Sequence, residues 1–175
     1  MKEILFRGKR IDNDEWVEGY YVKALDMYDK EIHVIFDTTA TFYSFGETSG
    51  FELIDPETIC QYTELNDKNA EPIYKNDIVD FLGHRGIVKF EFGTFGIFCE
   101  KHIDWDEIQA NIMPVTGCEN LLYVCKNDNF ISLWEIYWNF NDEDNYLSTV
   151  EVIGNVYDNP ELLEVQDGET DKNIQ

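Results

Sequence analysis

The sequence predicts a mainly β protein with a minor helical part, built from small antiparallel sheets. Phenylalanine and tyrosine are abundant, at 12 and 10 of the 175 residues, and aromatic residues favour strands over helices. Short runs of alternating polar and apolar residues recur along the chain. Turns containing glycine separate three of these runs at intervals of about 8–12 residues, which is typical of a small barrel or sandwich rather than a parallel sheet.

The first elements predict a hairpin and a third strand. Residues 2–7 and 16–22 alternate as strands, and the Asp-Asn-Asp run at 12–14 between them is a turn because these side chains bond to nearby backbone groups. Residues 31–36 alternate again, with Ile, Val and Phe on one face. The segment 38–50 is rich in Thr, Ser, Gly and aromatic residues, which predicts either a long loop or an irregular strand pair.

The middle of the chain predicts short strands joined by tight turns. An Asp-Pro-Glu-Thr turn at 55–58 leads into a strand at 59–63, and residues 66–70 form a dense turn. Three strands are then expected, at 78–82, 87–92 and 97–99. The connections between them, 83–86 and 93–96, contain glycine.

The last third of the chain predicts the helical part. Residues 102–113 form the best helix candidate, closed by a proline. Residues 129–140 have apolar residues at helical spacing but an aromatic content that suits a strand equally, so both alternatives stay open. Residues 148–157 alternate as a strand, and 159–163 begin a short helix with Asn followed by Pro.

These elements predict two subdomains and a tail. Residues 1–58 form an N-terminal β subdomain, and 59–165 form a β-barrel-like subdomain with a helical insertion near 102–140. Residues 166–175 contain a single apolar side chain and are expected to be a disordered tail.

Charge limits the classes of partner. The chain carries 36 acidic and 13 basic side chains, a net charge of −23, and 16 acidic but only 2 basic residues follow position 101. Such a field repels phosphates, which argues against direct binding to nucleic acids and to anionic membranes. Solubility alone explains the charge, and attraction to a basic partner is the alternative.

The hydropathy, the cysteines and the histidines predict the cellular compartment and whether a cofactor is bound. No apolar run is long enough to span a bilayer and the N-terminus is not a signal peptide, so we expect a protein of the bacterial host cytoplasm. The four cysteines (Cys60, Cys99, Cys118 and Cys125) form no C-x-x-C pair and are expected to be small buried residues. The acidic cluster from His102 to Glu107 is interpreted as a solvated helix start, so no metal or cofactor is predicted.

No catalytic residues are predicted either. The nucleophile, phosphate-binding and dinucleotide motifs are all missing from the sequence, and carboxylate pairs carry little information in so acidic a chain. The aromatic residues Phe90, Phe92, Phe95 and Phe98 are a candidate partner surface, because an aromatic groove on a small barrel binds peptides. Packing of these rings into the core is the alternative.

Three motifs together resemble the YopX family of phage and prophage proteins. They are MKEILFR at 1–7, QYTELNDKNAEPIYKNDIV at 61–79 and EVIGNVYDNPELL at 151–163, in the family's order and over nearly the whole chain. The resemblance implies a mainly β fold with an SH3-like barrel element and a phage or prophage origin. It implies no assigned enzyme activity and no catalytic residues.

The chain departs from the family at three turn positions. The family usually has glycine where this chain has Glu64, Ala70 and Asn76. Asparagine tolerates the left-handed conformation, whereas alanine is more strained there, so the turn at Ala70 either keeps that strain or changes type.

The motif residues themselves have a structural interpretation. Asp67 and Lys68 lie in a turn between two strands, and Asp77 accepts hydrogen bonds from nearby backbone donors where a strand begins. Asn155 bridges backbone groups, and Gly154 permits a close approach.

Three functional hypotheses follow. The first is an accessory protein of a phage or prophage that binds an unknown protein partner or self-assembles into a homo-oligomer, without enzyme activity. The second is an acidic DNA mimic that inhibits a host DNA-binding protein. The third is an enzyme with no recognisable motif.

Overall fold

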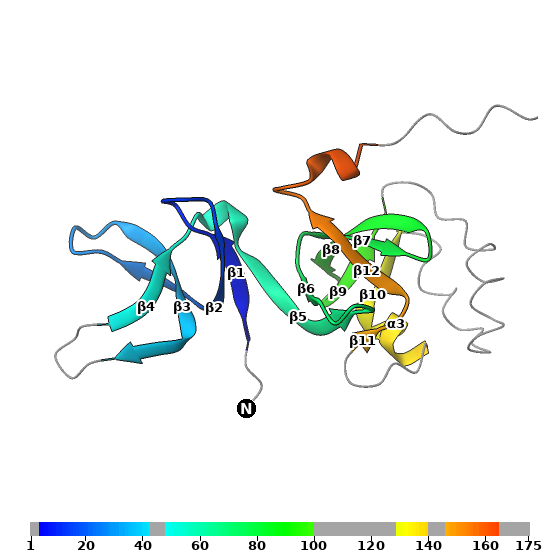
Figure 1. Ribbon diagram of the computed structural model, residues 1–175, viewed down its shortest axis with the longest axis horizontal. Coiled ribbons are helices and arrows are strands. Elements are labelled where there is room, and N and C mark those ends of the chain that lie inside the picture. Colours follow the sequence, from blue (N-terminus) through cyan, green and yellow to red (C-terminus); the bar gives the residue numbers. More distant parts are fainter. Residues whose placement is uncertain (1–3, 43–47, 100–128, 140–145, 165–175) are drawn as a thin grey trace, which may run out of the picture. The chain divides into compact units, whose positions relative to one another are not determined.

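The computed structural model describes residues 4–42, 48–99, 129–139 and 146–164. The chain divides into two compact units, Met1–Lys75 with Glu143–Tyr146 and Asn76–Asp142 with Leu147–Gln175. Strands dominate the described residues of both units (Figure 1). The mainly β class with a minor helical part is therefore confirmed. The SH3-like barrel element and the subdomain limits expected from the sequence stay predictions.

The first unit is one antiparallel sheet. Its strand order is β5-β1-β2-β3-β4, with β6 on β5, and Tyr146 of β11 (Tyr146–Leu147) extends it beyond β5. A 3-10 helix, η1 (Pro56–Thr58), precedes β5, and the Asp55 side chain caps it. The strands are β1 (Phe6–Lys9), β2 (Trp16–Leu25), β3 (Glu31–Phe42), β4 (Thr48–Leu53), β5 (Cys60–Asp67) and β6 (Pro72–Tyr74).

A carboxylate organises the β2–β3 hairpin. Asp26 Oδ1 accepts hydrogen bonds from the backbone N–H groups of Tyr28 and Lys30, at 2.8 and 2.9 Å. The backbone of Asp26 and Lys30 closes the turn with a further bond of 2.8 Å. This is the local bonding for which Asp is favoured in turns, and it fixes the register of the two strands.

Of the segment 38–50, for which the sequence predicts a long loop or an irregular strand pair, the described residues 38–42 and 48–50 belong to the strands β3 and β4. β3 and β4 are in register at Phe36 and Phe51, and again at Thr41 and Ser49. Four residues of β3 thus oppose only Gly50 of β4, and Gly50 takes a φ of 78°. The resulting bulge bends the ladder and opens a space beside it.

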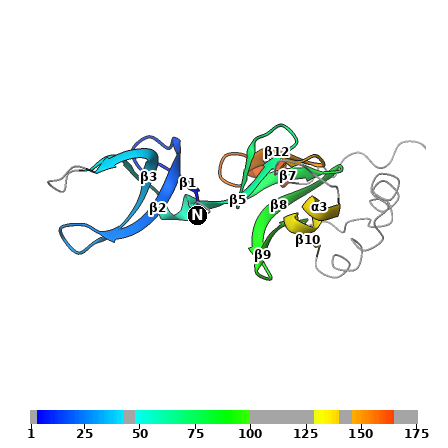
Figure 2. The same ribbon diagram turned by 90° about the horizontal axis from the view of Figure 1, so that it is seen from below.

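The second unit is a five-stranded antiparallel sheet with the order β10-β9-β8-β7-β12. The helix α3 (Leu133–Asn139) packs against β9 and β10 (Figure 2). A 3-10 helix, η2 (Pro160–Leu162), follows the last strand. The strands are β7 (Asp77–Phe81), β8 (His84–Glu91), β9 (Thr94–Phe98), β10 (Phe130–Ser132) and β12 (Val150–Asn155).

Each unit has its own buried apolar residues. In the first unit they are Val34, Ile35, Ile54, Cys60, Ile73 and Tyr74. In the second unit both faces of the sheet are buried, because residues that alternate along a strand point to opposite faces. Its buried residues are Ile78, Val79, Phe81, Ile87, Val88, Ile97, Cys99, Phe130, Ile131, Leu133, Ile136, Leu147 and Val150.

The structure changes two expectations and resolves a third. The expected connections at 83–86 and 93–96 are wrong in extent: each turn has two residues, and β8 and β9 begin at His84 and Thr94. Residues 130–139 are neither all strand nor all helix, since β10 passes directly into α3. Ser132 makes this switch by accepting a hydrogen bond at Oγ from the Trp134 backbone. The helix expected at 102–113 lies outside the described residues.

Candidate protein-binding surface

Two hairpin turns of the second unit share an unusual backbone. Leu82–Gly83 joins β7 to β8 and Phe92–Gly93 joins β8 to β9, and all four residues have positive φ, at 52°, 86°, 52° and 81°. Two-residue turns of this kind are type I′, in which Asn or Asp normally precedes Gly. A leucine or phenylalanine in the left-handed region is strained, because its Cβ crowds the backbone.

Phe92 combines this strain with exposure. Its side chain is 77% exposed, and its ring meets Phe130 edge-on, with centroids 5.6 Å apart. Phe90 is 54% exposed and contacts Phe95, at 5.0 Å between centroids. These four hairpin-tip rings form two contacting pairs, one on each face of the sheet, and Phe90 and Phe92 are the exposed members. Apart from its contact with Phe130, the Phe92 ring is in water, so little packing offsets the strain of its backbone.

The structure brings together some of the predicted partner-surface residues and separates another. Phe90 and Phe95 are a directly opposed pair and share one face of the sheet. Phe98 pairs with Ile87 and lies on the other face, where Lys89 Nζ is 4.0 Å from its ring centroid. Phe98 is also directly opposed to Phe130 on β10, so the Phe92 ring that meets Phe130 lies on the side of Phe98, and the Phe90–Phe95 pair lies on the other face.

Sequence reasoning missed a second group of exposed rings on α3. Leu133 and Ile136 are the buried residues of this helix, so Trp134 and Trp138 point outward, 58% and 62% exposed. Their rings meet edge-on at 5.5 Å. The i, i+4 spacing of the two tryptophans was the available signal, and it identifies an exposed pair only once the buried face of the helix is known.

The start of α3 lies beside the β8–β9 turn. Ser132 Oγ, which accepts from the Trp134 backbone, is 3.1 Å from Thr94 Oγ1, and Thr94 directly follows the turn. Glu91 is exposed next to the turn, and Glu135 follows Trp134. The exposed rings therefore have carboxylates as sequence neighbours, within a part of the chain (76–175) that carries 20 acidic and 5 basic residues.

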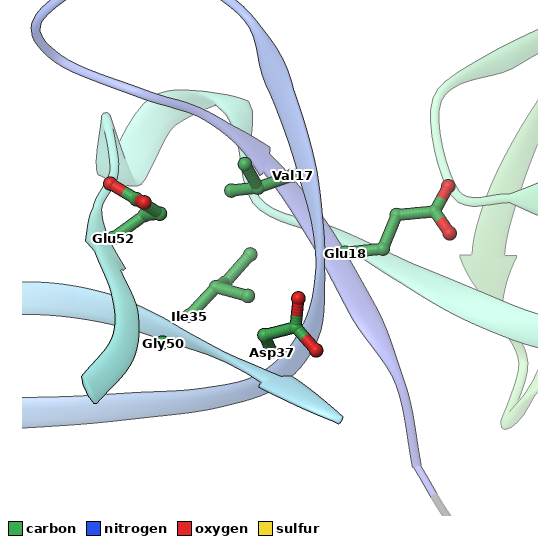
Figure 3. Close-up of a pocket in the computed structure, with 6 residues that line it drawn as sticks. All are labelled: Val17, Glu18, Ile35, Asp37, Gly50 and Glu52. Carbon is green, nitrogen blue, oxygen red and sulfur yellow. The ribbon is translucent and has the colours of Figure 1, made fainter. Parts of the chain in front are cut away.

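The bulge between β3 and β4 opens a hollow in the first unit, with a volume of about 380 Å³. Figure 3 shows the side chains of Val17 and Ile35 lying between the carboxylates of Glu52 and Asp37, while Glu18 points away. The Glu52 carboxylate is 3.3 Å from the Arg10 guanidinium. The hollow thus has an aliphatic floor and an acidic rim that is partly neutralised.

A polar network lies on the β2–β3 hairpin. Tyr21 Oη and His33 Nδ1 are 2.7 Å apart, and His33 Nε2 is 3.2 Å from Glu31. Lys23 bonds to the same carboxylate at 2.7 Å, and its hydrogen bond lowers the pKa of Glu31. Glu31 and Lys23 are both exposed. These contacts join the two strands of the hairpin.

The structural motif residues lie at turns and strand ends. Asp67 is fully buried, and its Oδ1 accepts from the backbone N–H groups of Asn69 and Glu71, at 2.7 and 2.9 Å, whereas Lys68 is exposed in the same turn. Asp77 is buried and opposes Asn155, so the second and third sequence motifs meet where β7 pairs with β12.

The Asn155 amide bridges backbone groups of the chain that follows it. Its Oδ1 accepts from the backbone N–H groups of Tyr157 and Asp158, each at 3.0 Å. A Cβ on Gly154 would lie 2.6 Å from Asn159 Oδ1, so the close approach there needs glycine. These contacts give the motif residues a structural role.

The three positions at which the family has glycine all take positive φ: 68° at Glu64, 69° at Ala70 and 69° at Asn76. The backbone has kept the left-handed conformation, and the strain expected at Ala70 is present. Asn76 makes use of its side chain, because its Nδ2 donates to Tyr157 Oη at 2.8 Å.

Cys60 and Cys99 are buried, as expected from the sequence, and burial raises the pKa of the Cys99 thiol to about 12. Cys118 and Cys125 lie outside the described residues. Within the described ranges no three His, Cys, Asp or Glu side chains are grouped as metal ligands, and no helix there is long and apolar enough to cross a bilayer.

Comparison with known families agrees with the motifs. The model of the YopX protein family matches residues 5–164 of the 175-residue chain. The chain belongs to the YopX family. A comparison with curated proteins found no match. The YopX match thus covers every strand of both units, including the β7–β12 pairing that joins the second and third motifs.

Proposed function

We propose that this YopX protein is a phage or prophage accessory protein that acts in the bacterial cytoplasm by binding a basic protein, without catalysis of its own. The observation that carries this proposal is Phe92, a phenylalanine held exposed at a strained turn position. Strain at a position whose side chain lies mostly in water is retained where function requires it. Exposed aromatic rings are the side chains that most often dominate protein interfaces.

Charge identifies the kind of partner. The second half of the chain is strongly acidic, and Glu91 adjoins the exposed rings. Arginine and lysine side chains pack on aromatic faces through cation–π contacts, and Lys89 on Phe98 is an example within this chain. A segment that alternates arginine with aliphatic residues suits a surface of rings bordered by carboxylates.

The test uses a substitution that should raise the free energy of unfolding and lower the affinity for the partner. Phe92→Asn gives the turn its preferred Asn-Gly sequence, so the free energy of unfolding should rise, while the affinity should fall about tenfold, or about 1.4 kcal/mol. Leu82→Asn is the matched control, since Leu82 has the same φ and the same following glycine. It should stabilise the fold equally and leave affinity unchanged.

The measurement is fluorescence anisotropy of a labelled synthetic peptide that alternates arginine with leucine, with glutamate in place of arginine in a control peptide. Urea unfolding of each variant reports stability. Equal binding by the wild type and Phe92→Asn would contradict the proposal, as would equal binding of the two peptides.

The net charge of −23 favours a second candidate, an acidic mimic of DNA that occupies a host DNA-binding protein. Mimicry requires carboxylates in an ordered row at phosphate-like spacing. Competition between this chain and a DNA duplex for a basic DNA-binding protein tests it. Loss of DNA from the complex, with an unchanged effect for Phe92→Asn, would favour mimicry over the aromatic surface.

A further inference from the structure

One face of the β2–β3–β4 sheet in the first unit is apolar where β2 and β4 pair with residues 32–36 of β3. Directly opposed residues on antiparallel strands share a face, so the register defines its members. We call these residues the apolar face. They form three cross-strand rows: Tyr20–Phe36–Phe51, Val22–Val34–Leu53 and Ala24–Ile32.

The apolar face is partly exposed. Four of its side chains on the outer strands β2 and β4, Tyr20, Val22, Phe51 and Leu53, are between 36% and 42% exposed, whereas Val34 at its centre is buried. Ile35 points to the opposite face and is 1% exposed. An antiparallel sheet normally turns one apolar face to the core and a polar face to water. Here Lys23, Glu31 and Glu52 lie on the polar face, and the apolar face is also partly open to water, as expected of a surface that another molecule covers.

The chemistry of the apolar face decides which molecule covers it. None of its eight side chains is charged at pH 7, in a chain with 36 acidic and 13 basic residues. A basic partner would gain nothing from its charge on such a face. Two copies of this chain repel one another through their charged surfaces, and least where charge is lacking. An apolar sheet face is also self-complementary across a two-fold axis.

We infer that a second copy of this chain covers the apolar face, with the two sheets packed face to face. The four exposed side chains present on the order of 300 Å² of accessible surface. A standard interface buries about 800 Å² on each partner, so the dimer is weak and depends on concentration. Because salt screens the repulsion between the acidic chains, raising the salt concentration strengthens the association.

Sedimentation velocity of the full chain over a concentration series tests this, at low and at high salt. Leu53→Lys places a charge on the apolar face at an edge strand, where the long side chain reaches water, and should weaken the association at least about tenfold. Leu25→Lys is the matched control, since Leu25 is 64% exposed but pairs with Glu31 on the opposite face. It should associate like the wild type.

Val22→Thr is a second variant that keeps the branched shape and replaces one methyl group by a hydroxyl, so it should weaken the dimer without loss of the fold. Circular dichroism of each variant confirms folding. A wild type that stays monomeric at every concentration and salt would overturn the inference, as would equal weakening by Leu53→Lys and Leu25→Lys. Phe92→Asn should leave the association unchanged, so this result is independent of the proposed peptide binding.

Discussion

The two units place their apolar side chains differently. In the second unit the sheet is buried on both faces, with Val79, Val88 and Ile97 on one and Ile78 on the other. Among the described residues of this unit, the exposed rings lie at a hairpin tip and on one side of α3. In the β2–β3–β4 sheet of the first unit, charged side chains lie on one face and the partly exposed apolar face is the other. The comparison teaches that exposed apolar surface has two forms here: isolated rings beside carboxylates, and a continuous uncharged face.

Two strained turns repeat the contrast on a smaller scale. Ala70 follows a turn that the buried Asp67 carboxylate holds from inside, so its left-handed conformation serves the fold. Phe92 also has a positive φ, but its side chain lies mostly in water. Strain alone therefore does not indicate function; strain with exposure of a large ring does.

The largest expected effect is a loss of free energy of unfolding when a buried phenylalanine of the second unit is removed, compared with an exposed one. Phe81 is fully buried, so Phe81→Ala should lower the free energy of unfolding by about 3–5 kcal/mol, from lost burial and the cavity left behind. Phe92→Ala, a matched control for the loss of a ring, should change it by no more than about 0.5 kcal/mol. Urea unfolding measures both. A similar loss for the two variants would show that Phe92 is packed.

The second largest effect on stability is expected from removal of the Asp67 carboxylate, which holds a turn of the first unit. Asp67→Ala leaves the two backbone N–H groups that Asp67 binds without their acceptor, so stability should fall by about 2 kcal/mol. Glu71→Ala, in the same turn but exposed, is the control and should be nearly neutral. Thermal or urea unfolding distinguishes them, and an Asp67→Ala variant as stable as the control would refute this role.

A smaller effect of opposite sign is expected at Ala70. Because the φ of Ala70 is 69°, Ala70→Gly removes the strain on Cβ and should raise the free energy of unfolding by about 1 kcal/mol. Asn69→Gly, one residue earlier and without a positive φ, should lower it slightly. If both glycine substitutions destabilise the protein equally, the turn is not strained in solution.

The smallest effect concerns one exposed ion pair of the first unit. The hydrogen bond from Arg10 lowers the pKa of Asp12. A carboxyl whose pKa is lower in the folded state stabilises the fold above its unfolded pKa, and this contribution is lost as the pH falls through the folded pKa. Arg10→Gln should therefore raise the pKa of Asp12 in an NMR titration. An unchanged pKa would mean that the pair does not persist in solution.

Much of the fold could be predicted from local patterns. Alternation located most strands, and Asp26, Asp55 and Asp67 have the turn and cap roles that their chemistry suggests. The β8 and β9 boundaries were misplaced because Leu and Phe precede glycine in turns that normally begin with Asn or Asp. The apolar face could not be predicted, since it depends on the register of three strands and on which face the core occupies.

The candidate partner surface was predicted only in part. An alternating run of phenylalanines does not reveal that Phe98 lies on the other face or that Phe92 is at a turn. Trp134 and Trp138 were not selected because the conformation of residues 129–140 was open. Which rings are exposed depends on tertiary packing, whereas the presence of a dense aromatic segment is a property of sequence.

The most direct test of the two forms of exposed surface is their response to salt. In one salt series, anisotropy measures the affinity of the arginine–leucine peptide and sedimentation measures self-association. A surface of rings beside carboxylates should lose affinity as salt rises, and an uncharged face of an acidic chain should gain it. Slopes of opposite sign are the predicted result; slopes of the same sign would contradict the distinction between the two surfaces.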